Sequence, residues 1–225
     1  MNAFDMRRKL AAEALGTAIL VAAIVGSGIM ATRLTKDMGL ALLGNTLPTG
    51  AILVVLILIL GPVSGAHFNP AVSIVMAGRA RMSWGEAGLY IAAQTIGGIA
   101  GALLAHLMFE LPLWQASRMI RTGGAQWFAE FVATFGLILT IFGIVRFRPE
   151  SAALAVGLYI TAAYWFTAST SFANPAVTLA RAFTDTFAGI APGDVPGFVA
   201  AQLAGAVAAS LTAAWLFAPE PPPRA

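Results

Sequence analysis

Six long apolar segments constrain this chain more than any other feature. They cover residues 10–32, 40–61, 84–109, 125–145, 152–169 and 196–217. A membrane-spanning helix needs roughly 20 mostly apolar residues, and these segments match that length. Only 10% of the 225 residues are charged and 59% are hydrophobic, whereas a soluble domain carries about 25% charged residues. The sequence therefore predicts an all-α membrane protein, with a single membrane domain over residues 1–225.

The charges indicate a membrane topology rather than a nucleic-acid partner. The net charge is +3, and the 13 Lys and Arg residues form no basic patch. Eight cations fall on one side of the predicted spans and five on the other, so the positive-inside rule places both termini in the cytoplasm. The cytoplasmic set is Arg7, Arg8, Lys9, Arg79, Arg81, Arg146, Arg148 and Arg224, and the opposite set is Arg33, Lys36, Arg118, Arg121 and Arg181.

Two compositional details complete this first outline. Residues 219–225 are rich in proline, and we expect a disordered cytoplasmic tail there. The chain has no cysteine, which excludes disulfides and Cys-ligated metals. No cofactor and no metal site are expected.

The second half of the chain repeats motifs of the first half in the same order. Residues 12–17 (AEALGT) recur loosely as 129–134 (AEFVAT), 67–73 (HFNPAVS) as 172–178 (FANPAVT), and 92–94 (AAQ) as 200–202. Each half, about residues 10–109 and 125–217, holds three spans and one short Asn-Pro-Ala segment. Because three crossings is an odd number, the second half must be inverted relative to the first.

Asn-Pro-Ala marks the beginning of a helix, since asparagine is a strong N-cap and proline suits the first turn. The short segments 67–77 and 172–182 cannot span a bilayer, and in inverted halves they enter from opposite faces as re-entrant half-helices. Two helix N-termini and two asparagine amides then meet at the midplane, where they repel cations and donate to neutral solutes. The predicted pore residues are Asn69, Pro70, Ala71, Asn174, Pro175 and Ala176.

This arrangement resembles the aquaporin and aquaglyceroporin family of major intrinsic proteins. The similarity covers about residues 12–217 and is carried by residues 64–72 (SGAHFNPAV), the second Asn-Pro-Ala, and the paired Glu13 and Glu130. It implies six transmembrane helices plus two re-entrant half-helices, a pore in each subunit, and a homotetramer in the lipid bilayer. It also implies passage of small neutral solutes and no enzymatic activity.

One departure from the family pattern lies beside the second motif. Family members usually carry arginine directly after the second Asn-Pro-Ala, where this chain has Val177. The other three constriction positions of the family correspond by spacing to Thr49, Ala162 and Ser171. The resemblance thus predicts a wide, uncharged selectivity filter with a weaker barrier to cations.

The Asn-Pro-Ala-Val sequence resembles a branch of aquaglyceroporins found with bacterial arsenic-resistance genes. That resemblance implies arsenite and methylated arsenicals as solutes, in the bacterial inner membrane. As(OH)₃ is a neutral, polyol-like solute and suits an uncharged pore, but nothing in the sequence favours it over glycerol or urea. An ordinary water or glycerol facilitator stays open as an alternative, and so does a coupled secondary transporter, which also uses inverted repeats.

Four side chains have two interpretations each. Glu13 and Glu130 lie within apolar spans, where they either relay protons or, as we favour, accept hydrogen bonds from the re-entrant loops. His67 is expected at the inner vestibule, where it either gates the pore with pH or holds the loop. Arg181 either replaces the missing filter charge or, as we favour, is a surface arginine near Asp185.

Overall fold

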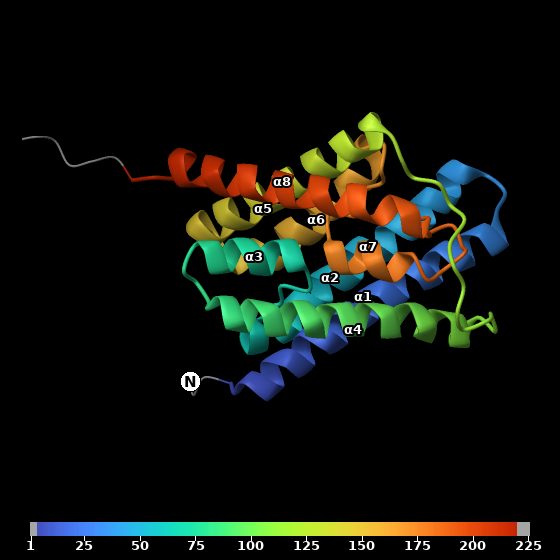
Figure 1. Ribbon diagram of the computed structural model, residues 1–225, viewed down its shortest axis with the longest axis horizontal. Helices are drawn as coiled ribbons and strands as arrows, with labels where there is room; N and C mark the ends of the chain where they lie inside the picture. The colour runs from blue at the N-terminus through green and yellow to red at the C-terminus, as the bar shows by residue number, and fades with distance from the viewer. Residues whose placement is uncertain (1–3, 220–225) are drawn as a thin grey trace, which may run out of the picture.

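The computed structural model describes residues 4–219, and within that range every regular element is a helix. Six long helices form a bundle with two short helices inside it (Figure 1). The long helices are α1 (Met6–Leu34), α2 (Met38–Ser64), α4 (Trp84–Met108), α5 (Gly124–Phe147), α6 (Ala152–Phe166) and α8 (Val195–Leu216). The short ones are α3 (Pro70–Gly78) and α7 (Pro175–Arg181), with 3₁₀ turns at Pro149–Ser151 and Pro192–Asp194.

Five of the long helices are long and apolar enough to cross a membrane, namely α1, α2, α4, α5 and α8 together with its preceding turn. The remaining predicted span, 152–169, corresponds to α6, which has 15 residues and ends three residues earlier than predicted. Its chain stops being helical at Thr167 and turns into left-handed backbone at Thr170, with φ of 60°. The predicted tail 219–225 lies, apart from Pro219, outside the described residues.

Polar residues begin the helices at the ends of the bundle. The Asp5 carboxylate accepts the N–H of Arg8 at 2.9 Å, and the Asp37 carboxylate accepts the N–H of Leu40 at 2.8 Å. At α4, Ser83 forms a reciprocal capping box with the glutamate three residues later. Each cap supplies an acceptor to N–H groups that have no partner within the helix, which stabilises the helix end by about 1 kcal/mol.

The two halves of the chain pack in the same pattern. In the first half α1 packs on α2 and α4, and in the second half α5 packs on α6 and α8. Gly97 and Gly101 of α4 face the carbonyls of Ala14 and Ala18 of α1 so closely that a Cβ there would overlap them. Small residues therefore allow the helix backbones to approach, as is typical of membrane bundles.

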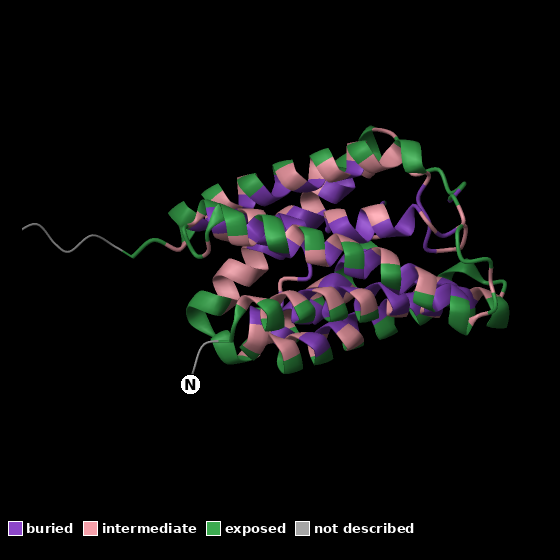
Figure 2. Ribbon diagram, turned by 60° about the horizontal axis from the view of Figure 1, so that its bottom comes forward, coloured by how far each residue is buried: buried purple, intermediate pink, exposed green. Residues whose placement is uncertain are grey.

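The short helices α3 and α7 run in line through the middle of the bundle and point their N-termini at each other (Figure 1). Helix α1 begins and α8 ends at the same end of the bundle, which we call the terminal end; the other is the distal end (Figure 1). Side-chain burial follows this plan, with exposed residues on the outward faces of the long helices and buried residues inward (Figure 2). The outward faces carry large apolar side chains such as Leu15, Leu58 and Ile96, as expected for contact with lipid.

Candidate functional site

The two Asn-Pro-Ala motifs begin the two short helices. The Asn69 side-chain oxygen accepts the N–H of Ala71 at 2.9 Å. The Asn174 oxygen accepts the N–H groups of Ala176 and Val177 at 3.0 and 3.2 Å. In each helix the proline occupies the first turn, where it has no N–H to leave unpaired. Both asparagines are thus N-caps, with their amide oxygens committed to their own helices.

The amide nitrogens of the same asparagines join the two halves of the chain. Asn69 Nδ2 donates to the carbonyl of Ala173, and Asn174 Nδ2 donates to the carbonyl of Phe68, each at 2.7 Å. A primary amide has two N–H groups, so one N–H of each asparagine remains for another acceptor. The junction therefore presents two donors beside two helix N-termini, whose partial charges are positive.

The loops that precede the motifs share an unusual backbone. Ala66 and Phe68 in the first loop have φ of 50° and 49°, and Ser171 and Ala173 in the second have φ of 50° and 48°. Left-handed backbone is unfavourable for residues with a Cβ, so these loops need support from their surroundings. Each left-handed residue of the first loop has a left-handed counterpart 105 positions later in the second loop. The repeat in the sequence is therefore also a repeat in backbone conformation.

The first loop is held by the buried carboxylate of Glu13. One oxygen accepts the Ser64 hydroxyl at 2.7 Å and the N–H of His67 at 2.9 Å. The other accepts the N–H of Phe68 at 2.7 Å and the side chain of Gln94 at 2.8 Å. A carboxylate with four donors is well compensated for its burial inside a helical bundle.

Glu130 holds the second loop in the same way. Its two oxygens accept the N–H groups of Phe172 and Ala173, both at 2.8 Å. Gln202 adds a bond of 2.6 Å to the carboxylate and one of 2.8 Å to the hydroxyl of Thr178. Neither this carboxylate nor that of Glu13 lines the cavity described next, so these contacts fit the loop-supporting interpretation rather than a proton relay.

A cavity of about 290 Å³ lies between the helices at the junction. Of the predicted site residues, both motif asparagines and four more side chains line it: Thr49, His67, Ser171 and Val177. Most of the remaining lining is apolar and comes from α1, α2, α5 and α6, for example Leu20, Leu53, Leu137 and Ile160. The cavity is thus largely apolar and includes the donors of the two motif asparagines in its lining.

The expectation that Ala162 borders the constriction is wrong. Ala162 is exposed on the outside of α6, whereas Ile160 and Tyr164 line the cavity. A helix turns about 100° per residue, so positions two residues apart point to nearly opposite sides. Counting back from Asn174 crosses the irregular turn between α6 and α7, and the spacing carried over from the family does not hold there. Tyr164 was not found from the sequence.

His67 borders the cavity on the side of α3. Its Nδ1 lies 3.0 Å from the Ser73 hydroxyl, and its ring lies 5.3 Å from that of Tyr90, centroid to centroid. Its backbone N–H is one of the groups bound by Glu13. These contacts fit a histidine that holds the loop, while its position at the cavity keeps the gating interpretation open.

Arg181 is not the surface arginine that we expected. It is only 2% exposed and lines the cavity. Its Nε donates to the carbonyl of Ala188, and its guanidinium carbon lies 3.3 Å from the centroid of the Phe172 ring. Asp185, the partner expected for it, instead binds Arg118, with a closest contact of 2.6 Å. Arg181 follows Val177 by four residues, about one helical turn, and this spacing is the feature of the sequence that indicates a place on the same face as Val177. The cavity is therefore not free of positive charge.

A second arginine, Arg121, supports the distal loops, whereas the sequence alone indicates only its charge. Its side chain donates to the carbonyl of Gly189 at 2.8 Å and, at 3.4 Å each, to those of Ser169 and Phe187. Burial lowers the pKa of Arg121, and the charge of Glu130 partly offsets this effect. Arg121 ties the segment before the second motif to the loop after α7.

Two half-helices that meet inside an inverted helical bundle, with a lined cavity at their junction, define a membrane protein of the broken-helix class, which includes channels and secondary transporters. The sequence profile of the family described as "Major intrinsic protein" matches residues 1–149 of this chain. The chain belongs to the major intrinsic protein family, the family of the aquaporins and aquaglyceroporins.

Individual relatives agree with this assignment. The chain is 61% identical over 222 residues to aquaglyceroporin AqpS of Rhizobium meliloti (strain 1021), a match that covers 99% of this chain and 95% of that protein. It is 33% identical over 172 residues to aquaporin Z of Photorhabdus laumondii, which covers 68% and 73% of the two chains. The X-ray structure of the aquaglyceroporin from Plasmodium falciparum matches the fold with a TM-score of 0.72, at 24% identity, over 92% of this chain and 95% of that one.

Proposed function

We propose that this protein is a passive channel for small neutral solutes, namely water, glycerol-like polyols and arsenite, with methylated arsenicals as further solutes. The observation that carries the proposal is the junction of the two half-helices. There Asn69 and Asn174 each keep one N–H free of the bonds that hold the junction, and both line the cavity. An oxygen of a neutral solute accepts from these donors, whereas a cation meets two positive helix ends.

The side chains beside the second motif support solutes larger than water. Val177 follows Ala176 directly and lines the cavity together with Thr49 and Ser171. A valine at this place leaves more room than the arginine that is usual in the family. The rest of the wall is mostly apolar and suits the carbon backbone of a polyol, which loses little by leaving water for such a surface.

Stopped-flow light scattering on proteoliposomes tests this proposal. Water, glycerol, urea and arsenite are each expected to cross faster in proteoliposomes than in protein-free liposomes. If water alone crosses faster, the protein is a narrower water channel. If water and glycerol cross but urea and arsenite do not, it is an ordinary water and glycerol facilitator, and the wide filter at Val177 is wrong.

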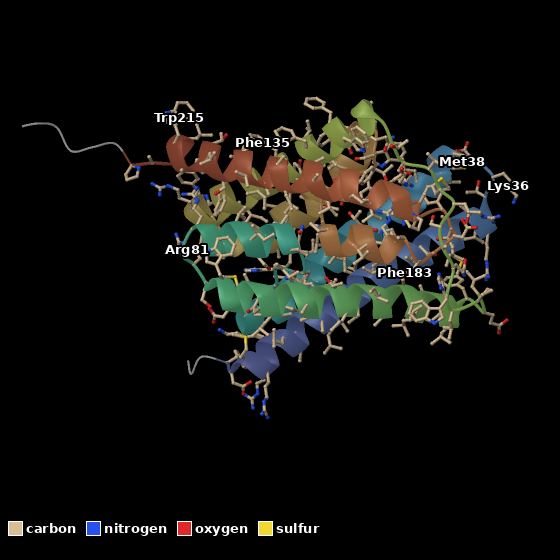
Figure 3. The ribbon with its side chains drawn as sticks, in the orientation of Figure 1. Lys36, Met38, Arg81, Phe135, Phe183 and Trp215 are labelled. Carbon is tan, nitrogen blue, oxygen red and sulfur yellow. The ribbon has the colours of Figure 1, made fainter. Side chains whose placement is uncertain are left out.

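We also propose the assembly and the orientation that the sequence suggested. The exposed apolar faces of the long helices fit both lipid and neighbouring subunits of a homotetramer. Arg81 and Trp215 lie at the terminal end of the bundle and Lys36 and Met38 at the distal end (Figure 3). With the larger set of cations at the terminal end, both termini face the cytoplasm of a bacterial inner membrane. Light scattering of the detergent-solubilised protein tests the tetramer, and protease accessibility in intact cells tests the orientation.

A further inference from the structure

The distal part of the cavity holds two buried polar groups that have no hydrogen-bond partner among the described residues. They are Nη1 of Arg181 and the hydroxyl oxygen of Ser171. Both residues line the cavity, and each is only 2% exposed. A buried donor without an acceptor costs about 1–3 kcal/mol, and more if it is charged. The two groups therefore favour any ligand that brings acceptor oxygens to this place.

The charge of Arg181 is also without a direct counter-ion. Within residues 4–219 the ion pairs are Arg8 with Asp5 and Arg118 with Asp185, and neither involves Arg181. A second guanidinium, that of Arg121, lies near the Phe172 ring, which also contacts Arg181. The guanidinium carbon of Arg181 is 3.3 Å from the ring centroid, and that of Arg121 is 5.1 Å from it. A buried charge is stable only when it is paired and hydrogen-bonded, so this end of the cavity favours a negative ligand.

The nearby carboxylates do not fill this role. Glu130 accepts the N–H groups of Phe172 and Ala173 and the Gln202 amide. Asp194 accepts the backbone N–H of Arg121 at 2.7 Å. The charge of Glu130 moderates the positive potential at Arg121 and Arg181, but neither carboxylate forms an ion pair with the guanidinium of Arg181.

From these contacts we infer a binding site for small monovalent oxyanions at Arg181 and Ser171. The guanidinium supplies charge and N–H donors, which suit the oxygens of an oxyanion, and the Ser171 hydroxyl supplies a further donor. The Phe172 ring, stacked on Arg181, forms an apolar wall beside it. Since these residues line the same cavity as Asn174 and Val177, a bound anion occupies the path of neutral solutes and slows their passage.

Methanesulfonate is a suitable test anion, because it is a strong acid that stays ionised and carries three oxygens. Proteoliposomes are loaded with equal methanesulfonate on both sides, in place of chloride at constant ionic strength, and a glycerol gradient is then applied. The inference rests on the proposed function, since it uses glycerol flux. We expect that flux to fall as methanesulfonate replaces chloride, independently of how the protein is oriented in the vesicle.

Three variants distinguish the site from the surface charge around it. Arg181→Gln is expected to raise the half-inhibitory concentration about tenfold or more, the factor for ~1.4 kcal/mol of one charge-assisted hydrogen bond. Ser171→Ala is expected to raise it less; Ala66 occupies the matching left-handed position of the first loop, so an alanine fits this backbone. Arg118→Gln is the control, because that side chain is 88% exposed and bound to Asp185; it is expected to keep the wild-type inhibition.

A binding measurement without flux separates the two proposals. In detergent, methanesulfonate is expected to raise the unfolding temperature of the wild type above that in chloride, and to raise it less in Arg181→Gln and Ser171→Ala. If methanesulfonate does not change the glycerol flux, and the wild type unfolds at the same temperature in methanesulfonate and in chloride, the oxyanion site is overturned. Absence of glycerol flux in chloride overturns the proposed function instead, and the unfolding temperatures then still decide on the site. If methanesulfonate inhibits Arg118→Gln as strongly as the wild type, the result supports the site. If inhibition is lost in Arg118→Gln and kept in the other two variants, the effect comes from surface charge and the site is wrong.

Discussion

Replacement of Glu130 by glutamine is the perturbation whose cost follows most directly from the structure. The Glu130 carboxylate is fully buried and accepts the N–H groups of Phe172 and Ala173, both at 2.8 Å. A glutamine has one acceptor oxygen and one NH₂ group at the same positions. One of the two backbone N–H groups then faces another donor and loses its partner.

The expected loss of stability is the cost of one buried, unpaired backbone N–H. That cost is about 1–3 kcal/mol. For a chain of this length each kcal/mol lowers the unfolding temperature by about 2–4 °C, so the variant should unfold about 2–12 °C below the wild type. Water and glycerol flux should also fall. Ala173, whose N–H is bound by Glu130, also accepts the hydrogen bond of Asn69 through its carbonyl, so a displaced second loop disturbs the junction of the two half-helices.

Thermal unfolding of the detergent-solubilised protein, followed by circular dichroism, measures this loss. Glu150→Gln is the matched control, because it makes the same chemical change at an exposed residue of the turn before α6. It should stay within about 0.5 kcal/mol of the wild type. Equal unfolding temperatures for Glu130→Gln and Glu150→Gln would refute the assignment of Glu130 as the support of the second loop.

Three further predictions concern the filter, the helix packing and a surface ion pair. Val177→Arg should keep water flux and sharply reduce arsenite and glycerol flux in stopped-flow assays. Val177→Met is the control that adds bulk without charge. Unchanged arsenite flux in both variants would show that position 177 does not limit the passage of solutes. Gly97→Leu should destabilise the protein by about 1–3 kcal/mol or more in thermal unfolding, because its side chain overlaps the α1 backbone, whereas Gly88→Leu, with open space around it, should not. The backbone N–H of Arg118 and, to a lesser extent, its side chain donate to the Asp185 carboxyl and hold its pKa below its usual 3.8. The contribution of this group to stability is therefore present above about pH 4 and is lost as the pH falls further. Arg118→Gln removes the side-chain bond and keeps the backbone bond, so it should reduce part of this acid-side loss in unfolding curves measured against pH, and an unchanged pH dependence would contradict the side-chain contribution.

The helices and the central junction could be predicted because their signals are local. Asn69 and Asn174 are each followed by proline, and a cap followed by a first-turn proline marks a helix start whatever surrounds it. The recurrence of the motif in a second set of three spans then required the halves to be inverted. The contacts of Glu13 and Glu130 with the loops agree with this symmetry, since equivalent carboxylates reach equivalent backbone groups.

Ala162 and Arg181 show where the sequence is insufficient. The position of Ala162 was counted across the turn at Thr170 and Ser171, whose left-handed backbone no residue pattern in this segment announces. The environment of Arg181 depends on Phe172 and on Ala188, which belong to the loops on either side of α7. Burial that arises from folded loops is a tertiary property, and hydrophobic periodicity within one helix does not report it.

Glycerol uptake into proteoliposomes, measured against glycerol concentration with and without an imposed proton or sodium gradient, tests the central claim most directly. A passive channel predicts an initial rate that rises in proportion to the glycerol gradient and is the same with or without the ion gradient. A rate that saturates at low glycerol concentration, or that requires the ion gradient, would contradict the channel and indicate a coupled secondary transporter.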